Sequence, residues 1–188
     1  PDQRAGRYEP DEIQRRFESI ADTAAGDPAL QDAVAILGPE LARLSKARSD
    51  DLATGLIHAD LFIDNVLFDG EGKLTALIDF EQAAWGRLAY DMAVCLLSFA
   101  FGRDDFRPEL TRAFLDGYAE HRQPTDAESA AFGDELCFAA CRFAVTRLTD
   151  VYLRRTPGAP AGKDFRRYLQ RLDKVKAHIA AGDGLLRL

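Results

Sequence analysis

Cysteine is scarce in this sequence of 188 residues, and where it occurs its surroundings are apolar. The three cysteines, Cys95, Cys137 and Cys141, lie among Ala, Val, Leu and Phe, where a free thiol behaves as a small buried hydrophobe. Cys137 and Cys141 are spaced four residues apart and could form half of a metal site, but no second cysteine pair completes it. We therefore expect reduced core cysteines, which are typical of a cytoplasmic protein.

Positive charge and long apolar runs are also in short supply. The chain has 24 Lys and Arg against 31 Asp and Glu, a formal net charge of −7, which argues against nucleic-acid or anionic-membrane binding as its main task. A small anionic ligand is not excluded, because a local site can differ in charge from the whole surface. No apolar run reaches the ~20 residues of a membrane-spanning helix, and the N-terminal "PDQRAGRYEPDE" lacks the pattern of a secretory signal.

Apolar residues at helical spacing predict a mostly helical protein. A break or kink is expected at Gly38-Pro39, a buried helix over 90–102, where the chain is apolar on nearly all sides, and a capping box at Thr125 to Glu128. Asp164 is expected to cap the last helix and Gly182 to end it. The predicted helices cover residues 10–25, 28–48, 90–102, 108–122, 125–153 and 163–182.

Residues 55–80 have a different pattern, with three short apolar runs, "GLIH", "NVLFD" and "LTALIDF". The polar segment 69–73 between the second and third runs predicts a β hairpin in which Gly70 and Gly72 adopt positive φ. After Trp85-Gly86 the chain is expected to return to helix. The fold class is therefore α+β and mostly helical, with a helical segment over 1–54, a β insertion over 55–85 and a helical core over 86–188.

A group of polar residues accompanies the β insertion. His58 and Asp60 follow the first run, Asn65 begins the second, and Asp79 lies near the end of the third. A phosphoryl transferase needs a carboxylate that accepts a hydroxyl proton and aims the oxygen, and it needs an amide and a second carboxylate that hold Mg²⁺ on the ATP phosphates. A hairpin would bring Asn65 and Asp79 to one ion. The alternative is that these are unrelated polar residues of loops. We interpret Asp64 in that way, as a turn residue.

The segments "HADLFIDN" and "LIDF" resemble the catalytic core of the protein-kinase-like phosphotransferases that act on small molecules, which include aminoglycoside phosphotransferases and choline kinases. Within that group, "GLIHADLFIDNVLFDGEGKLTALIDF", "LAYDMAVCLL" and "RFAVTRLTDVYLRR" resemble the bacterial homoserine kinases of this fold. The resemblance runs roughly from residue 55 to 175, and the first fifty residues match only in helical character. It implies ATP- and Mg²⁺-dependent phosphoryl transfer to the hydroxyl of L-homoserine, a reaction of threonine biosynthesis.

The resemblance also implies a role for each polar residue. Asp60 becomes the catalytic base or substrate-orienting carboxylate, and Asn65 and Asp79 become the Mg²⁺ ligands. His58 becomes a structural residue that braces the loop, and Asp91 anchors the loop from the following helix.

An amino-acid substrate needs partners for its amine and its carboxylate. Glu81, two residues after Asp79, is a candidate for the ammonium. Arg147 lies in an otherwise apolar helix and is our candidate for the carboxylate, although an internal salt bridge from Arg147 to Asp150 or Asp91 explains it equally well. His121 and His178 are assigned to the surface.

The sequence lacks the N-terminal nucleotide lobe of such kinases. Before Gly55 there is no glycine-rich strand–turn–strand and no Val-Ala-x-Lys strand, and Lys46 is the only lysine there. The chain therefore resembles the C-terminal lobe alone. Three explanations remain open. The chain is a fragment of a longer enzyme, which Pro1 in place of Met mildly favours; a partner supplies the missing lobe; or the catalytic apparatus has been lost.

We expect the isolated chain to bind ATP poorly, to turn over slowly or not at all, and to expose apolar surface where the lobe would dock. Two other functions remain open at this point. One is a kinase for an aminoglycoside, choline or ethanolamine, and the other is a non-catalytic scaffold.

Overall fold

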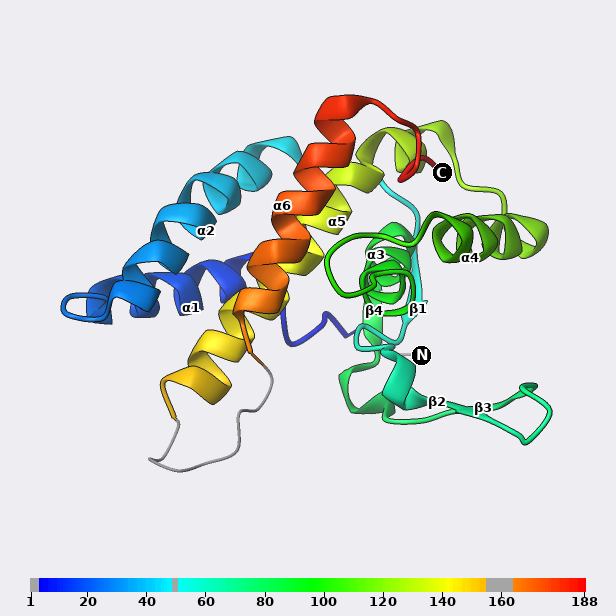
Figure 1. Ribbon diagram of the computed structural model, residues 1–188, viewed down its shortest axis with the longest axis horizontal. Helices are drawn as coiled ribbons and strands as arrows, with labels where there is room; N and C mark the ends of the chain where they lie inside the picture. The colour runs from blue at the N-terminus through cyan, green and yellow to red at the C-terminus, as the bar shows by residue number, and fades with distance from the viewer. Residues whose placement is uncertain (1–3, 49–50, 155–163) are drawn as a thin grey trace.

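The computed structural model describes residues 4–48, 51–154 and 164–188, and most of these residues are helical (Figure 1). None of the helices in these ranges is both long and apolar enough to cross a membrane. The elements in chain order are α1 (Pro10–Thr23), α2 (Pro28–Ala47), β1 (Thr54–Ile57), η1 (Ile63–Asn65), β2 (Val66–Phe68), β3 (Leu74–Leu77), η2 (Phe80–Gln82), β4 (Ala84–Arg87), α3 (Leu88–Phe99), α4 (Pro108–His121), α5 (Asp126–Arg147), η3 (Leu148–Tyr152) and α6 (Arg166–Ala181).

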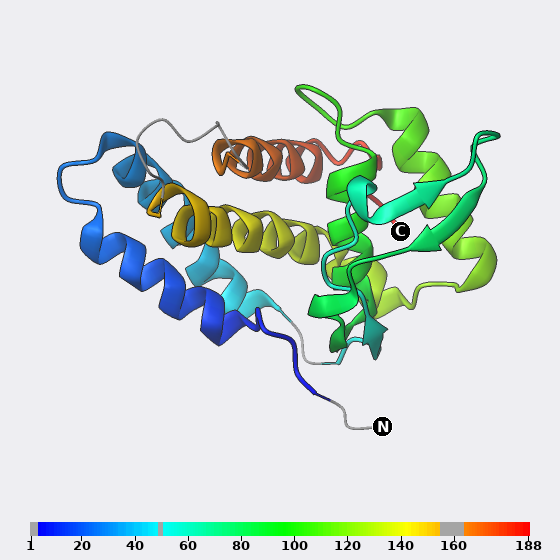
Figure 2. The ribbon, with the colours of Figure 1, turned by 90° about the horizontal axis from the view of Figure 1, so that it is seen from below.

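Helix α5 forms the centre of the molecule. It is buried along most of its length, and α6, α3, α2 and α1 lie around it (Figures 1 and 2). Helix α1 contributes Ile13, Phe17 and Ile20 to the same hydrophobic core that contains Leu136 of α5 and Leu172 of α6. The N-terminal helices therefore share one core with the C-terminal helices.

The expected break in the second helix was wrong. Helix α2 runs through Gly38 and Pro39 without interruption. A Cβ added at Gly38 would lie 3.1 Å from Cζ of Phe17, so the glycine allows α1 to approach α2 closely. Leu37 and Leu41 on either side are buried, and this packing outweighs the local preference of proline to interrupt a helix.

The predicted cap of the long helix is confirmed. Thr125 accepts from the Glu128 N–H at 3.2 Å, and the Glu128 carboxylate accepts from the Thr125 N–H at 2.9 Å. The α-helix ends at Arg147, and a π-helical turn extends it to Tyr152. At the end of α6, Gly182 adopts a left-handed conformation with φ 61°, as predicted.

The hairpin is confirmed, with two corrections. β2 and β3 are antiparallel, with Val66 opposite Leu77. Of the two turn glycines, Gly72 has positive φ and Gly70 does not. The third run forms a strand only as far as Leu77, because Asp79 turns the chain in a left-handed conformation.

A second β ribbon was missed. Residues 84–87, which we expected to lead into helix, form β4 and pair with β1. A Cβ at Gly86 would collide with the Cδ1 atom of Ile57, so a larger residue at this crossing would force the buried Ile57 side chain to move. This pairing lets the loop after β1 and the start of α3 lie next to each other.

Candidate active site

The loop after β1 turns sharply at Ala59, which has a φ of 63°. Such a conformation is strained for a residue with a Cβ and persists only when its surroundings hold it. Asp91, in the first turn of α3, accepts the backbone N–H groups of His58 at 3.1 Å and Ala59 at 2.7 Å. The Asp91 carboxylate therefore anchors the loop that carries Asp60.

Asp91 is half-buried. Burial raises the pKa of this carboxyl above its ordinary value, and the two backbone N–H bonds from His58 and Ala59 oppose the rise. Burial thus disfavours the charged form of this carboxylate, and the two backbone hydrogen bonds offset part of that cost. Ionisable groups with perturbed pKa values of this kind are common in functional sites.

His58 connects the loop to the hairpin. Its side chain is buried, and its Nε2 donates a hydrogen bond to the carbonyl oxygen of Ile78 at 2.9 Å. Its ring lies 4.6 Å from that of Phe80, measured between centroids. Because Asp79 lies between these two contacts, His58 positions the backbone on both sides of it.

Asn65 connects the same two segments from the other side. Its side-chain Nδ2 donates to the backbone carbonyl of Asp60 at 2.9 Å. The backbone carbonyl of Asn65 accepts the N–H of Ile78 at 3.0 Å. The first bond directs the Asn65 side-chain oxygen away from that carbonyl, and the second brings Asn65 beside the Ile78–Asp79 peptide. Asp79 itself is exposed. An amide oxygen and a carboxylate at neighbouring positions are suitable ligands for Mg²⁺, so the residues present fit such an ion.

Asp60 is held by an arginine from the central helix. Nη1 of Arg142 donates to Oδ1 of Asp60 at 3.0 Å. The Arg142 side chain is 3% exposed and that of Asp60 is 24% exposed. The guanidinium lies against two rings, 4.1 Å from the centroid of Tyr8 and 3.8 Å from that of Phe143. The carboxylate therefore has a fixed orientation beside a rigid cation.

The two candidate substrate residues lie in different surroundings. Glu81 is exposed and accepts a hydrogen bond from its neighbour Gln82. Arg147 lies against the ring of Tyr168, 4.4 Å from its centroid, and donates to the backbone carbonyl of Asp164 at 3.2 Å. The expected internal salt bridges are not formed, because Asp150 accepts from Arg16 and Asp91 accepts from the loop backbone.

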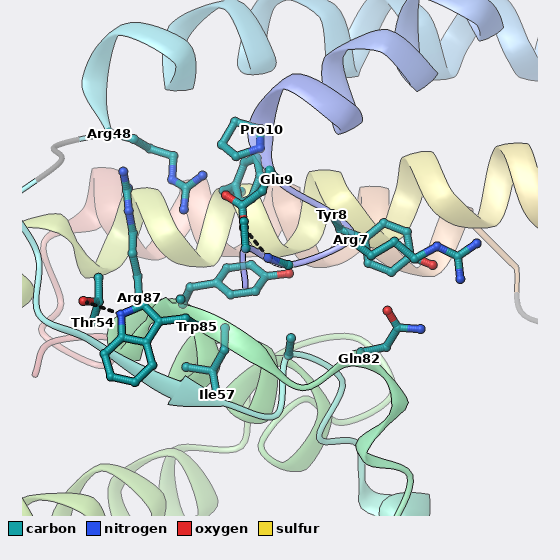
Figure 3. Close-up of a pocket in the computed structure, with 16 residues that line it drawn as sticks. Arg7, Tyr8, Glu9, Pro10, Arg48, Thr54, Ile57, Gln82, Trp85 and Arg87 are labelled. Atoms are coloured by element: carbon teal, nitrogen blue, oxygen red, sulfur yellow. Dashed lines mark hydrogen bonds between the residues drawn. The ribbon is translucent and has the colours of Figure 1, made fainter. Parts of the chain in front are cut away.

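A cavity of about 290 Å³ lies beside the loop (Figure 3). The N-terminal residues 5–10 cover it, the β1–β4 ribbon forms another wall, and Ala59 lies at its edge. Three arginines line it, Arg7, Arg48 and Arg87. Arg48 and Arg87 donate to Glu135, which is fully buried, at distances of 2.6 to 3.0 Å. The cationic charge in this cavity is therefore already balanced in part by the protein.

Sequence reasoning missed three features around the loop. The Arg142 partner was unassigned, although an arginine in an apolar helix was a signal that an acid or ligand lies nearby. Glu135 in the same helix gave a similar signal that was not used. Tyr8 had no signal at all, because its contact with Arg142 exists only after folding.

Comparison with known proteins gives consistent similarities. The profile of the Phosphotransferase enzyme family matches residues 2–132. The chain is 44% identical over 135 residues to a homoserine kinase of Rhodopseudomonas palustris strain BisA53, which covers 71% of this chain and 40% of that relative. The family match starts near the N-terminus, so the likeness extends well before residue 55, where the motifs alone placed its limit.

Solved structures share the fold. The choline kinase LicA from Streptococcus pneumoniae has a TM-score of 0.60 and 16% identity, and the match covers 92% of this chain and 56% of that one. The amicoumacin kinase hAmiN, solved with AMP-PNP, Ca²⁺ and Ami, has a TM-score of 0.59 and 20% identity, with coverages of 92% and 51%. The fold is thus kinase-like, and the chain spans about half the length of the curated relatives it matches, or less.

Proposed function

The chain belongs to the Phosphotransferase enzyme family, and from that membership we propose that it is the catalytic lobe of an ATP- and Mg²⁺-dependent kinase that phosphorylates the hydroxyl of L-homoserine. One observation carries the proposal: the hydrogen bonds of Asn65 join the Asp60 backbone to the Ile78–Asp79 turn. This connection supports the proposal, because phosphoryl transfer requires a carboxylate and oxygen ligands for the metal close together.

Asp60 is the residue that receives the acceptor in this proposal. Its carboxylate accepts a hydrogen bond from the substrate hydroxyl and aims the oxygen at the γ-phosphate. It takes the proton as the new bond between the substrate oxygen and the γ-phosphorus forms and the bond from that phosphorus to the bridging oxygen of ATP breaks, so that ADP leaves. In a loose transition state this work is mainly positioning. The bond from Arg142 and the anchoring of the loop by Asp91 keep the carboxylate in its orientation.

Asn65 and Asp79 would hold the metal through their side-chain oxygens. Mg²⁺ bound there supplies neutralisation of the charge on the nucleotide phosphates. His58 is a bracing residue in this account, because its Nε2 is engaged by the Ile78 carbonyl and is committed to holding the hairpin end.

Homoserine is preferred as the acceptor because curated relatives at 39 to 44% identity are named homoserine kinases, whereas the solved kinases named for choline or aminoglycosides are 16 to 22% identical. A kinase for choline, ethanolamine or an aminoglycoside is the second candidate, and the fold shared with those structures supports it.

An exposed apolar surface supports the expectation that a further lobe completes the enzyme. Of the twelve large hydrophobic side chains that are exposed among the described residues, eight lie between residues 56 and 80. The hairpin that carries several of them projects away from the helical body (Figure 1). We call this the hairpin surface; its members are Leu56, Ile63, Leu67, Phe68, Leu74, Leu77, Ile78 and Phe80.

Patches of this kind mark interaction sites, and the curated relatives are about twice as long as the matched region or longer. We propose that the nucleotide lobe, encoded outside these 188 residues, covers the hairpin surface. In its absence the isolated chain should self-associate and release little ADP. Sedimentation velocity should detect oligomers that disappear when Leu67 and Leu74 are replaced by lysine.

The central experiment measures ADP release by the protein expressed from its complete reading frame. L-homoserine, choline, ethanolamine and an aminoglycoside are offered separately with ATP and Mg²⁺. We expect release with homoserine, and a fall in kcat of about 10²- to 10⁴-fold in Asp60→Asn. Asp64→Asn is the matched control, because Asp64 is an exposed aspartate of the same loop.

Three results would separate the candidates. Release with choline or an aminoglycoside alone favours the second candidate. Equal activity in the Asp60 and Asp64 variants refutes the assigned chemistry. Nucleotide binding that does not depend on Mg²⁺, and does not change in Asp79→Asn, favours a non-catalytic scaffold.

A further inference from the structure

The arginines that are not exposed divide into two groups. In the first group, each guanidinium donates to a carboxylate within the described chain, as expected when a charge leaves water. Arg147 and Arg171 form the second group, and neither makes an ion pair with any carboxylate that the structure describes. The pairs of the first group are Arg16 with Asp150, Arg48 and Arg87 with Glu135, Arg122 with Glu128, and Arg142 with Asp60.

Arg147 and Arg171 lie on the same aromatic side chain. Their guanidinium carbons are 4.4 and 4.6 Å from the ring centroid of Tyr168, which is fully buried. Tyr168 stacks on Phe143 at 5.0 Å between centroids, and Phe143 lies 3.8 Å from the guanidinium of Arg142. The two unpaired cations are thus connected by packed rings to the arginine that holds Asp60.

The electrostatic state of this arginine pair is unfavourable without a ligand. Burial lowers the pKa of both guanidinium groups, and the charge of Arg171 lowers that of Arg147 further. Asp60 opposes the shift of Arg147, so the two lie within electrostatic reach of each other. The Nε of Arg171 is buried with no hydrogen-bond partner in the described part of the chain. Two cations held in this way would be stabilised by an anion.

Position distinguishes this arginine pair from the nucleotide side of the site. Arg147 lies five residues beyond Arg142 on α5, about 7.5 Å along the helix axis, whereas Asn65 and Asp79 lie at the base of the hairpin. In Figure 1 the end of α5 and the start of α6 lie across the molecule from the hairpin. An anion at Arg147 and Arg171 therefore approaches Asp60 from the helical body, opposite to the nucleotide.

We propose that Arg147 and Arg171 form a subsite for the carboxylate of the acceptor, a proposal that rests on the proposed function. The enzyme then requires an amino-acid alcohol and discriminates against alcohols that carry only an amine. The planar fork of a guanidinium suits a carboxylate. The same two charges repel choline, ethanolamine and aminoglycosides, which are cations. The subsite thus determines which alcohol is phosphorylated while Asp60 performs the positioning common to all.

Calorimetric titration of the 188-residue chain tests the subsite. The ligands are L-homoserine and 3-amino-1-propanol, which has the same hydroxyl and amine but no carboxylate. We expect homoserine to bind about 10- to 100-fold more tightly, the effect of a charge-assisted hydrogen bond on an equilibrium. Arg147→Met and Arg171→Met should each weaken homoserine binding and remove most of this preference, whereas affinity for 3-amino-1-propanol should stay the same or rise, because one repelling charge is gone.

Arg166→Met is the matched control, because Arg166 lies on α6 like Arg171 but is exposed. It should leave both affinities unchanged. The melting temperatures of Arg147→Met and Arg171→Met should fall by less than that of Arg142→Met, because neither guanidinium has a carboxylate partner among the described residues, although each loses its contact with the Tyr168 ring. A merely structural role predicts a lower melting temperature with no change in ligand preference.

The proposal is overturned if the unaltered chain fails to bind homoserine, if it binds both ligands equally, or if inorganic phosphate competes at these arginines and homoserine does not. Homoserine-dependent ADP release by the complete protein is measured in parallel. If that release persists without a carboxylate preference, the subsite alone is wrong; if release is absent as well, the proposed function fails with it.

Discussion

Replacement of Arg142 by methionine tests how Asp60 is held. The substitution removes one charge-assisted hydrogen bond, at 3.0 Å, and two contacts between the cation and the rings of Tyr8 and Phe143. The bond is worth about 1.5–3 kcal/mol and each ring contact about 0.5–1 kcal/mol. Methionine recovers part of the packing, and the 24% exposure of Asp60 screens part of the charge.

We therefore expect a loss of about 2–3 kcal/mol in the free energy of unfolding, which corresponds to a fall of roughly 5–10 °C in melting temperature for a chain of this size. Circular dichroism at 222 nm during heating measures it. Arg166→Met, at an exposed arginine, should change the melting temperature by less than about 2 °C.

A double-mutant cycle identifies the cause of this loss. If the unpaired Asp60 carboxylate is responsible, Arg142→Met should destabilise the Asp60→Asn protein by about 1–2 kcal/mol less than it destabilises the original chain. An equal loss in both backgrounds would show that Arg142 acts through packing alone, and the account of how Asp60 is oriented would be wrong.

Three further changes have expected outcomes. Burial opposes protonation of His178, but its bonds to Asp183 and Asp105 outweigh burial and raise its pKa. The resulting stability is present below about pH 6.5 and is lost as pH rises through the raised pKa. His178→Gln should abolish this pH dependence of the melting temperature, measured from pH 5 to 9. Asp79→Gly should remove Mg²⁺-dependent nucleotide binding yet raise stability by about 1 kcal/mol, because φ is 65° at this position; a destabilised variant would contradict the strain argument. Glu135→Gln removes the charge of a fully buried carboxylate that accepts from Arg48 and Arg87 and should lower the free energy of unfolding in urea by about 3–5 kcal/mol, whereas a loss below about 1 kcal/mol would refute the importance of this triad.

Local patterns were sufficient for much of the fold. The helical stripe of Ile13, Phe17 and Ile20 is buried as expected, and the capping box at Thr125 begins α5. The hairpin follows from the polar turn at 69–73. These features depend on neighbours a few residues away, so the sequence contains the information that determines them.

The assignment of the two other histidines illustrates the limit of local patterns. Both were assigned to the surface, and His121 is exposed. His178 is half-buried and bonds Asp105, a residue 73 positions earlier in the chain. No spacing within α6 signals such a partner.

By itself, the sequence predicted the polar set of Asp60, Asn65 and Asp79, because a short loop and a hairpin leave few other arrangements, and the bonds of Asn65 do connect the segments that carry these residues. Tertiary structure alone decided which charges are matched: Asp60 pairs with Arg142, 82 residues away, and Arg147 has no acid partner among the residues that the structure describes. Partners distant along the chain are selected by how helices pack around α5, and that packing depends on the whole core. The polar loop and Arg147 could therefore be proposed in advance, whereas the contacts of Arg142 with Asp60 and of Arg171 with Tyr168 became visible only in the folded molecule.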